Sequence, residues 1–246
     1  MKKDLGIVQA VFPMPVLMVA SYDENGVPDV MNAAWGMISK PDQITLYLSE
    51  PHKTVKNIRF SKAFTVSLAD EAHVAEADFF GMASGNNMPD KFEKSGLTQT
   101  KSSRVNAPVV EEFPLAIECE LQEIIETEHS HAIVGKIVNV MADENVLDEE
   151  GKVDPAKLNA VIFDNFRSGY YKVGDKVAQA WDAGKKLRFD ACFVIRLSNV
   201  RFPCFLSILK QHTTEHLQFF PVLCKVTWKS ANPSYPFCPS TQSASF

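Results

Sequence analysis

The feature that most limits the fold is a series of short β-like runs separated by turns, with only one brief helical pattern among them. Four runs are predicted to be strands, at residues 15–21, 27–39, 44–49 and 64–68. The helical pattern covers residues 54–62, and Asn25 and Gly26 form an Asn-Gly turn that closes the first two runs into a hairpin. Alternating βα units would place a helix after each strand. We therefore predict an antiparallel barrel in a mainly β (α+β) fold with peripheral helices.

The second half of the chain continues this pattern. Residues 71–82 have a helical composition and are predicted to cover the barrel as a helix. Residues 88–97 are typical of a capped helical turn, and two long strands are expected at residues 115–126 and 131–141. A last helix is predicted at residues 175–184.

The junction between the third strand and the first helix is predicted to bind an anion, because the first N–H groups of a helix lack partners within it. Five side chains with hydroxyl, amide or basic groups lie at this junction: Ser49, His52, Lys53, Thr54 and Asn57. A helix N-terminus contributes about 0.3–1 kcal/mol to holding an anion, whereas each charge-assisted hydrogen bond adds roughly 1.5–3 kcal/mol, so the cluster as a whole suits a phosphate. The same spacing also fits an ordinary capped surface helix with a solvated lysine.

Charge and apolar content limit the classes of partner. The 246 residues carry a formal net charge of −5 and are 46% hydrophobic, which allows a sizeable core and argues against broad nucleic-acid binding. No membrane-spanning segment is recognisable. A secretory signal is not expected either, because Asp4 lies early and Pro13 and Pro15 interrupt the only apolar stretch near the N-terminus. We expect a cytoplasmic protein without nucleic-acid or membrane partners.

Several catalytic and metal-binding chemistries lack their motifs. No Gly-rich dinucleotide motif or P-loop occurs, and the acidic stretch 143–151 lacks the ligand spacing of a calcium loop. Glu126, His129 and His131 could form a metal cluster at a strand end, but exposed loop residues or a polar pocket edge fit them better, so no metal is assigned. Cys119 lies alone in an alternating strand, which is typical of a core residue rather than a nucleophile.

The C-terminal residues 188–246 differ in composition from the rest. They carry six basic and two acidic side chains, four of the five cysteines, eight of the seventeen phenylalanines and none of the eleven glycines. We predict that residues 1–187 form the folded domain. Residues 188–246 are predicted to be an atypical tail outside that fold, arising from a frame change, a read-through or a misjoined coding segment. A secreted disulfide module fits less well, because the attached domain is expected in the cytoplasm.

Nine stretches within residues 15–174 match one family in order: residues 15–19, 26–35, 53–58, 64–68, 81–85, 90–92, 107–108, 117–119 and 135–137. On these stretches the chain resembles the flavin reductase-like, FMN-binding split-barrel family, specifically its flavoredoxin-type members. The resemblance implies a six-stranded antiparallel split β-barrel and a homodimer with FMN near the subunit interface. It also implies redox activity at the isoalloxazine ring, with NADH or NADPH as co-substrate and an acceptor that includes free flavin or a redox partner protein.

The resemblance also implies roles for particular residues. The segment along the flavin ring and ribityl chain corresponds to Asn32, Ala33, Ala34 and Trp35. The phosphate end corresponds to Ser49, His52, Lys53, Thr54 and Asn57, in agreement with the anion junction. The loop that closes over the cofactor, within the chain or from the partner subunit, corresponds to Ser84, Gly85 and Lys91. His52 and Asn86 stand where family members often have arginine, and His131 either approaches the ring edge or lies on the rim.

No catalytic side chain is nominated, because a flavin carries the chemistry while the protein supplies binding, orientation and electrostatics. We expect an FMN-dependent oxidoreductase that passes electrons from NAD(P)H through the flavin to an acceptor. Two alternatives stay open. One is a flavoredoxin-type FMN electron carrier that does not itself oxidise NAD(P)H, and the other is a barrel-like interaction domain without a working site.

Overall fold

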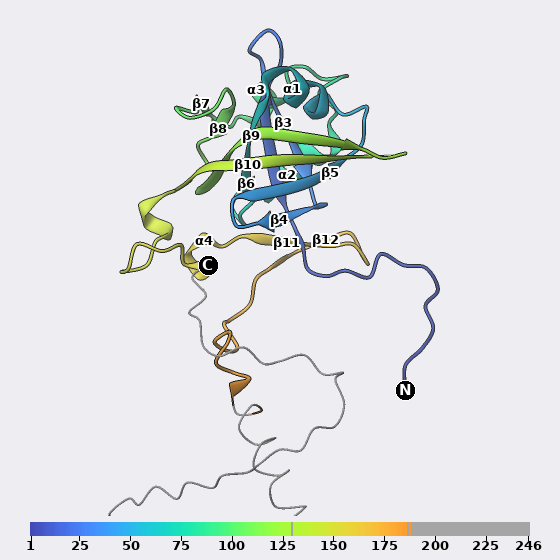
Figure 1. Ribbon diagram of the computed structural model, residues 1–246, viewed down its shortest axis with the longest axis vertical. Coiled ribbons are helices and arrows are strands. Elements are labelled where there is room, and N and C mark those ends of the chain that lie inside the picture. Colours follow the sequence, from blue (N-terminus) through green and yellow to red (C-terminus); the bar gives the residue numbers. More distant parts are fainter. Residues whose placement is uncertain (129, 186, 188–246) are drawn as a thin grey trace, which may run out of the picture. The chain divides into compact units, whose positions relative to one another are not determined.

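The computed structural model describes residues 1–128, 130–185 and 187 (Figure 1). The chain divides into two compact units, Met1–Asp175 and Lys176–Phe246, and the fold described below is that of the first. The tail predicted at residues 188–246 lies outside the described residues, so the boundary after residue 187 stays a prediction.

The described chain forms twelve β-strands and five helical segments. The strands are β1 (Met14–Pro15), β2 (Leu17–Tyr22), β3 (Pro28–Ala33), β4 (Gly36–Lys40), β5 (Gln43–Leu48), β6 (Ala63–Leu68), β7 (Gln99–Lys101), β8 (Pro108–Val110), β9 (Leu115–Glu126), β10 (His131–Ala142), β11 (Val161–Asp164) and β12 (Gly169–Lys172). The helices are α1 (Lys53–Ser61), α2 (Val74–Met82), α3 (Lys91–Ser95), the 3-10 helix η1 (Glu144–Val146) and α4 (Pro155–Leu158). The predicted mainly β fold with peripheral helices is confirmed.

The main sheet is antiparallel and closes on itself. Its strand order is β3-β2-β6-β9-β10-β5-β4. The two end strands, β3 and β4, are separated in the chain by only Ala34 and Trp35, so the sheet begins and ends on one stretch of backbone. The backbone N–H of Tyr47 donates to the Trp35 carbonyl at 2.8 Å, which ties this stretch to β5. The predicted continuous strand at residues 27–39 is therefore interrupted, and the sheet has seven strands, or six when β3 and β4 count as one bent strand.

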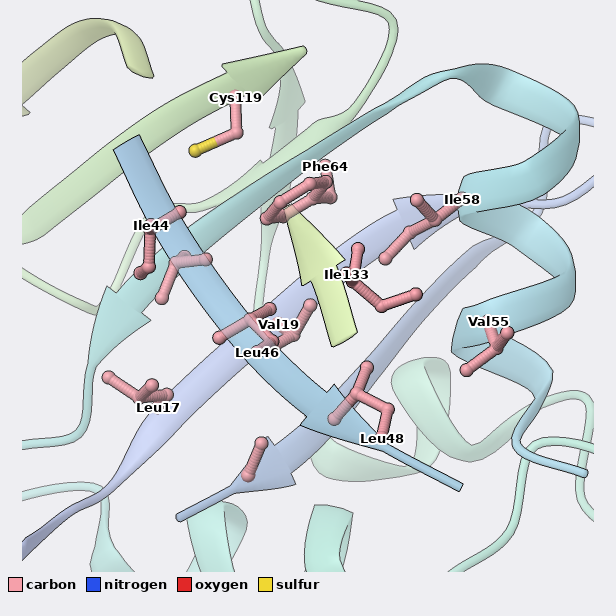
Figure 2. Packing of buried hydrophobic residues seen from close by; sticks show 12 residues of the cluster. Leu17, Val19, Ile44, Leu46, Leu48, Val55, Ile58, Phe64, Cys119 and Ile133 are labelled. Carbon is pink, nitrogen blue, oxygen red and sulfur yellow. The ribbon is translucent and has the colours of Figure 1, made fainter. Parts of the chain in front are cut away.

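The barrel interior is filled by alternate residues of its strands (Figure 2). Figure 2 shows side chains from several strands converging, among them Leu46 of β5 and Phe64 of β6. Gly135 of β10 lies against the Phe64 ring, and a Cβ there would collide with that ring. The glycine is required because no side chain fits between the strand and the aromatic ring.

Helices α1 and α2 position the candidate site. Val55 and Ile58 of α1 are buried in the barrel core, so the opposite face of this helix is left to solvent. Ala77 and Phe80 of α2 pack in a second apolar cluster on the other side of the β2–β3 hairpin. The start of α1 and the end of α2 therefore both lie close to β3.

The other predicted elements are mostly confirmed. The two long strands are β9 and β10, and the helix predicted at residues 71–82 begins later, at Val74, after Asp70 accepts from the His73 N–H at 3.0 Å. The helix predicted at residues 175–184 is wrong, since these residues form turns and irregular backbone. Trp181, at 93% exposure and with a φ of 59°, buries no apolar face that would stabilise so short a helix. Among the described residues, no helix is both long and apolar enough to cross a membrane.

Candidate functional site

The start of α1 and the loop after α2 enclose a cavity of about 100 Å³ above β3. Six of its lining residues belong to the predicted site: His52, Lys53, Thr54, Ser84, Gly85 and Lys91. The first three come from α1 and its N-cap, and the others from the loop and from α3. The fold thus brings together two groups of residues that are distant in the sequence.

Asp29 of β3 lies at the centre of this cavity wall. Its carboxylate accepts a hydrogen bond from the Thr54 hydroxyl at 3.0 Å and pairs with the Lys91 ammonium at 3.1 Å. The Lys91 ammonium also donates to the Ala83 carbonyl at 3.2 Å. The side chains of Asp29, Thr54 and Lys91 are all buried. The contacts of Asp29 therefore fix the loop and the start of α1 on β3. Sequence reasoning did not select Asp29.

Gly85 allows the loop to approach this wall. A Cβ at Gly85 would collide with a carboxylate oxygen of Asp29 and come within 3.3 Å of the Lys53 Cβ. Only glycine therefore lets the loop backbone lie against both groups. This cavity, called the cradle below, is closed on one side by backbone rather than by a side chain, which leaves room for a small anion.

The N-terminus of α1 has features of an anion site. Its N-cap residue, His52, makes no side-chain capping hydrogen bond, and the first turn has no acidic residue. A helix start without an acidic or hydroxyl cap presents its N–H groups and the positive end of its dipole to a ligand. The local sequence thus leaves the helix uncapped at the point where it borders the cavity.

His52 lies half-buried in the cavity wall. Its Nδ1 atom is buried and has no hydrogen-bond partner within the described residues. Burial, together with the Lys91 ammonium, lowers the pKa of His52, although Asp29 acts in the opposite direction. The imidazole is therefore neutral near pH 7, with a nitrogen available to a bound group.

Lys53 is held away from the cavity by an acidic residue of the β2–β3 turn. Its ammonium lies 3.0 Å from Asp23, whose other carboxylate oxygen accepts from the N–H groups of Asn25 and Val27 at 2.9 Å each. Hydrogen bonds to the carboxylate and the charge of Lys53 lower the pKa of Asp23 against the opposing effect of desolvation. Lys53 borders both this turn and the cavity, so its ammonium has two alternative partners once an anion is present.

The remaining phosphate-end residues lie near the cavity but do not line it. Asn57 is buried and donates to the Ser21 hydroxyl at 3.3 Å. Ser49 is exposed, and its carbonyl accepts from the His52 N–H at 3.2 Å. Asn86 donates to the Pro51 carbonyl at 2.7 Å, which holds the loop beside the helix start.

The four residues predicted to lie along a flavin ring are divided among three environments. Asn32 points towards α2 and donates to the Ala77 carbonyl at 3.0 Å and to the Tyr170 hydroxyl at 3.4 Å. Ala33 is buried in the barrel core. Ala34 and Trp35 line an apolar groove of about 550 Å³, in which Trp35 is 51% exposed. The described chain alone therefore does not gather these residues around one cavity.

His131 is buried at the start of β10, where its Nε2 contacts the Glu50 carboxylate. Arg59 lies 3.6 Å from Glu50 and 3.1 Å from Glu126, so this cluster is a network of ion pairs at the strand ends. Among the described residues, no group of three or more His, Cys, Asp or Glu side chains has metal-binding geometry. His129, the third member of the metal cluster considered from sequence, lies outside the described residues.

Cys119 is buried in the barrel core, as predicted for this strand position. Burial, with the nearby Glu118 carboxylate, raises the pKa of its thiol to about 12. A thiol that stays protonated is a poor nucleophile.

Comparison with known proteins identifies the family. Residues 9–170 match the model of the flavin reductase like domain. The chain belongs to this family. The sequence-based assignment is therefore confirmed.

Solved structures agree with this assignment. Flavoredoxin of Desulfovibrio vulgaris (Miyazaki F) is 40% identical, with a TM-score of 0.72 over 75% of this chain and 100% of that chain. Flavoredoxin from Methanosarcina acetivorans is 24% identical, with a TM-score of 0.69 over 76% of this chain and 100% of that chain. An FMN-binding protein from Thermus thermophilus, solved with bound 1-cyclohex-2-enone, is 18% identical, with a TM-score of 0.61 over 73% of this chain and 98% of that chain. The split-barrel fold of the family is thus shared along the described domain.

The residues at the start of α1 fit the phosphate of a flavin mononucleotide. The helix start supplies backbone N–H groups, Lys53 a cation, and His52 a buried nitrogen that lacks a partner among the described residues. The volume of about 100 Å³ suits one phosphate group but is well below the roughly 300–1,000 Å³ of a complete small-molecule pocket. The cradle therefore accounts for one end of the ligand only.

Proposed function

We propose that this protein binds FMN, with the phosphate in the α1 cavity, and passes electrons from NADH or NADPH through the flavin to an acceptor. The observation that supports this most directly is the cradle itself. It combines an uncapped helix start with an unpartnered buried nitrogen and a glycine-backed loop. A neutral ligand would gain little from these groups, whereas a phosphate dianion interacts favourably with each of them.

The flavin, when bound, supplies the hydride and electron chemistry, and the side chains have binding and positioning roles. Lys53 and the backbone N–H groups of the first turn of α1 would hold the phosphate, and Asp29 would keep Thr54 and Lys91 in place in the cavity wall. Asn32 to Trp35 would carry the ribityl chain and ring along the junction of β3 and β4. No general acid or base is required of the protein for this reaction.

A homodimer is part of this proposal. The cavity of one chain is too small for the isoalloxazine ring, so a second copy is expected to complete the pocket. Large apolar side chains are exposed close to the β3–β4 junction: Trp35, Met37, Ile38 and Tyr47. Contiguous exposed apolar surface of this kind is typical of an interface. Light scattering of the purified full chain would give a dimer mass, whereas a monomer that binds FMN fully would contradict this part.

An FMN electron carrier that does not oxidise NAD(P)H is the second candidate. It is favoured by the 40% identity to a flavoredoxin, which is the highest among the structures compared above. In either case the ligand and its cradle are the same. The candidates differ only in the source of electrons.

Absorption spectra of the full chain reconstituted with FMN would separate these functions. We expect a flavin spectrum that bleaches when NADH or NADPH is added without oxygen. A bound flavin that bleaches with a chemical reductant but not with either nucleotide would select the carrier. A chain that does not bind FMN would overturn both. Cell fractionation would test the cytoplasmic location, which remains a prediction.

A further inference from the structure

A second cavity, of about 290 Å³, lies beside the phosphate cavity and shares Lys53 with it. One wall is the β2–β3 turn, which contributes Asp23, Glu24 and Asn25. The other wall is a face of α1 together with Asn86: the helix residues are Lys53, Lys56, Asn57 and Phe60. Positions i, i+3, i+4 and i+7 lie along one face of a helix, so these four side chains form a continuous stripe.

The chemistry of this stripe changes along its length. The end nearest the phosphate cavity is cationic, with Lys53 and then Lys56, and the far end is aromatic, with Phe60 at 60% exposure. Phe60 is not a member of the apolar core clusters of the described chain. An exposed aromatic face beside cations suits a heterocyclic base that carries phosphate.

The acidic turn supplies a hydrogen-bond acceptor for the hydroxyl groups of a sugar. Glu24 lines the cavity on this wall, and a carboxylate accepts hydrogen bonds from ribose hydroxyls, whereas the Asp23 carboxylate already accepts from Lys53 and from the N–H groups of Asn25 and Val27. The polar groups are also held in place. Lys56 donates to Asn86 at 3.1 Å, and Asn86 in turn donates to the Pro51 carbonyl. The cavity is therefore lined by cations and an aromatic ring on α1 and by a carboxylate on the turn.

The volumes of the two cavities fit two neighbouring phosphate-bearing groups. The α1 cavity has space for a single phosphate, and the second has space for a group near the lower limit of small-molecule pockets. Lys53 borders both, so phosphates bound on either side of it would share one cation.

The geometry points to the second cavity as a subsite for the adenosine 5′-phosphate group of a dinucleotide, with the base on Phe60 and the phosphate between Lys53 and Lys56. This inference rests on the proposed function only for the identity of the dinucleotide, which is FAD or a pyridine dinucleotide. Both carry the same adenosine phosphate group. The subsite itself is defined by the side chains of the α1 stripe and the β2–β3 turn.

The first experiment measures binding of AMP alone to the full chain by isothermal titration calorimetry, for the natural sequence and for Phe60→Ala. Loss of base stacking is expected to weaken AMP about tenfold. Phe166→Ala is a matched control, since Phe166 is similarly exposed, at 54%, and does not line the cavity. AMP that does not bind, or that binds equally well to Phe60→Ala, would overturn the inference.

The second experiment identifies the source of the adenosine group. If FAD affinity falls in Phe60→Ala while FMN affinity is unchanged, the subsite belongs to a flavin dinucleotide. If flavin affinities are unchanged and the KM for NADH rises with kcat retained, it belongs to the pyridine nucleotide. If the chain binds AMP through Phe60 but does not bind FMN, the subsite would stand and the proposed function would be overturned. Equal losses of FMN and AMP affinity in Phe60→Ala would contradict a separate subsite.

Discussion

The ammonium of Lys91 lies 3.1 Å from a carboxylate oxygen of Asp29, and both side chains are almost fully buried. This pair joins the start of α3 to β3 beneath the loop that contains Gly85. Removing one partner of a buried pair leaves the other charge without compensation, which costs far more than the pair contributes. Asp29 therefore controls the shape of the cradle, whose wall it helps to form.

We predict that Asp29→Ala lowers the free energy of unfolding by about 3–5 kcal/mol, because Lys91 would remain buried without a counter-charge. The Thr54 hydroxyl would lose its partner as well. Urea unfolding of the full chain measures this change. Asp90→Ala is the control, since its pair with Lys94 is exposed and its loss should cost no more than about 1 kcal/mol. Equal costs for the two variants would show that burial of the Asp29 pair has no energetic consequence.

Asp23→Asn should increase the affinity for FMN. The substitution removes the charge that pairs with Lys53, while the amide oxygen can still accept from the turn N–H groups. Exposed pairs contribute about 0.2–1 kcal/mol, and this pair is partly buried, with exposed fractions of 23% for Lys53 and 11% for Asp23, so the gain is expected near the upper end, at roughly fivefold. Quenching of flavin fluorescence gives the dissociation constant. An unchanged constant would mean that Lys53 does not move from Asp23 to the phosphate.

FMN affinity should depend on the protonation of His52. Its pKa is lowered by burial and by Lys91 in the ligand-free chain, and a phosphate dianion would raise it again by favouring the imidazolium. Binding then takes up a proton. The gain in affinity is complete below the ligand-free pKa and is lost as the pH rises through the ligand-bound pKa, by about tenfold for each unit that separates the two.

His52→Arg provides the control for this pH dependence. The phosphate itself has a second pKa of about 6, and its ionisation affects both proteins alike. The ratio of the two dissociation constants therefore isolates the imidazole. We expect the arginine variant to bind more tightly, with an advantage that grows as the pH rises from the lowered ligand-free pKa of His52 through its ligand-bound pKa. A ratio that is constant with pH would exclude His52 from the phosphate site.

Gly85→Ala is expected to distort the cradle. The added Cβ would collide with Asp29 and crowd Lys53, so overpacking should cost about 1–3 kcal/mol of stability and weaken FMN binding. Gly174→Ala is the matched substitution, because nothing lies within 4 Å of a Cβ at that position. Thermal unfolding and FMN titration of both variants measure the difference. Similar results for the two would place the ligand away from the Gly85 loop.

The strand end and helix start at the proposed anion junction could be predicted from sequence because their signals are local. The strand end, the helix start and the basic side chains all occur between Ser49 and Asn57. Asp29 could not be predicted in the same way. The alternation of β3 indicates that Asp29 and Met31 share a face, but which face meets Lys91 depends on contacts between distant segments.

The order of elements was also predictable, whereas two backbone features were not. The break between β3 and β4 at Ala34 and Trp35 follows from closure of the sheet, which hydrophobic alternation along one strand does not encode. The helix predicted at residues 175–184 had a suitable composition, but Trp181 is exposed among the described residues and buries no apolar face there. Composition predicts a helix only where tertiary contacts support it.

Closure of the sheet at Ala34 and Trp35 has a consequence for chain topology. If a circular permutant had its new ends at these two residues, β3 and β4 would be released at opposite sides of the strand order. β3 and β4 are the two end strands of the sheet and are not paired with each other, so the cut would remove the covalent link between the two edges, and exposed edges can pair with strands of other molecules. The same cut at the turn around Gly151 would leave the strand pairing of the main sheet intact. The two residues that join the end strands thus tie the two edges of the sheet to each other.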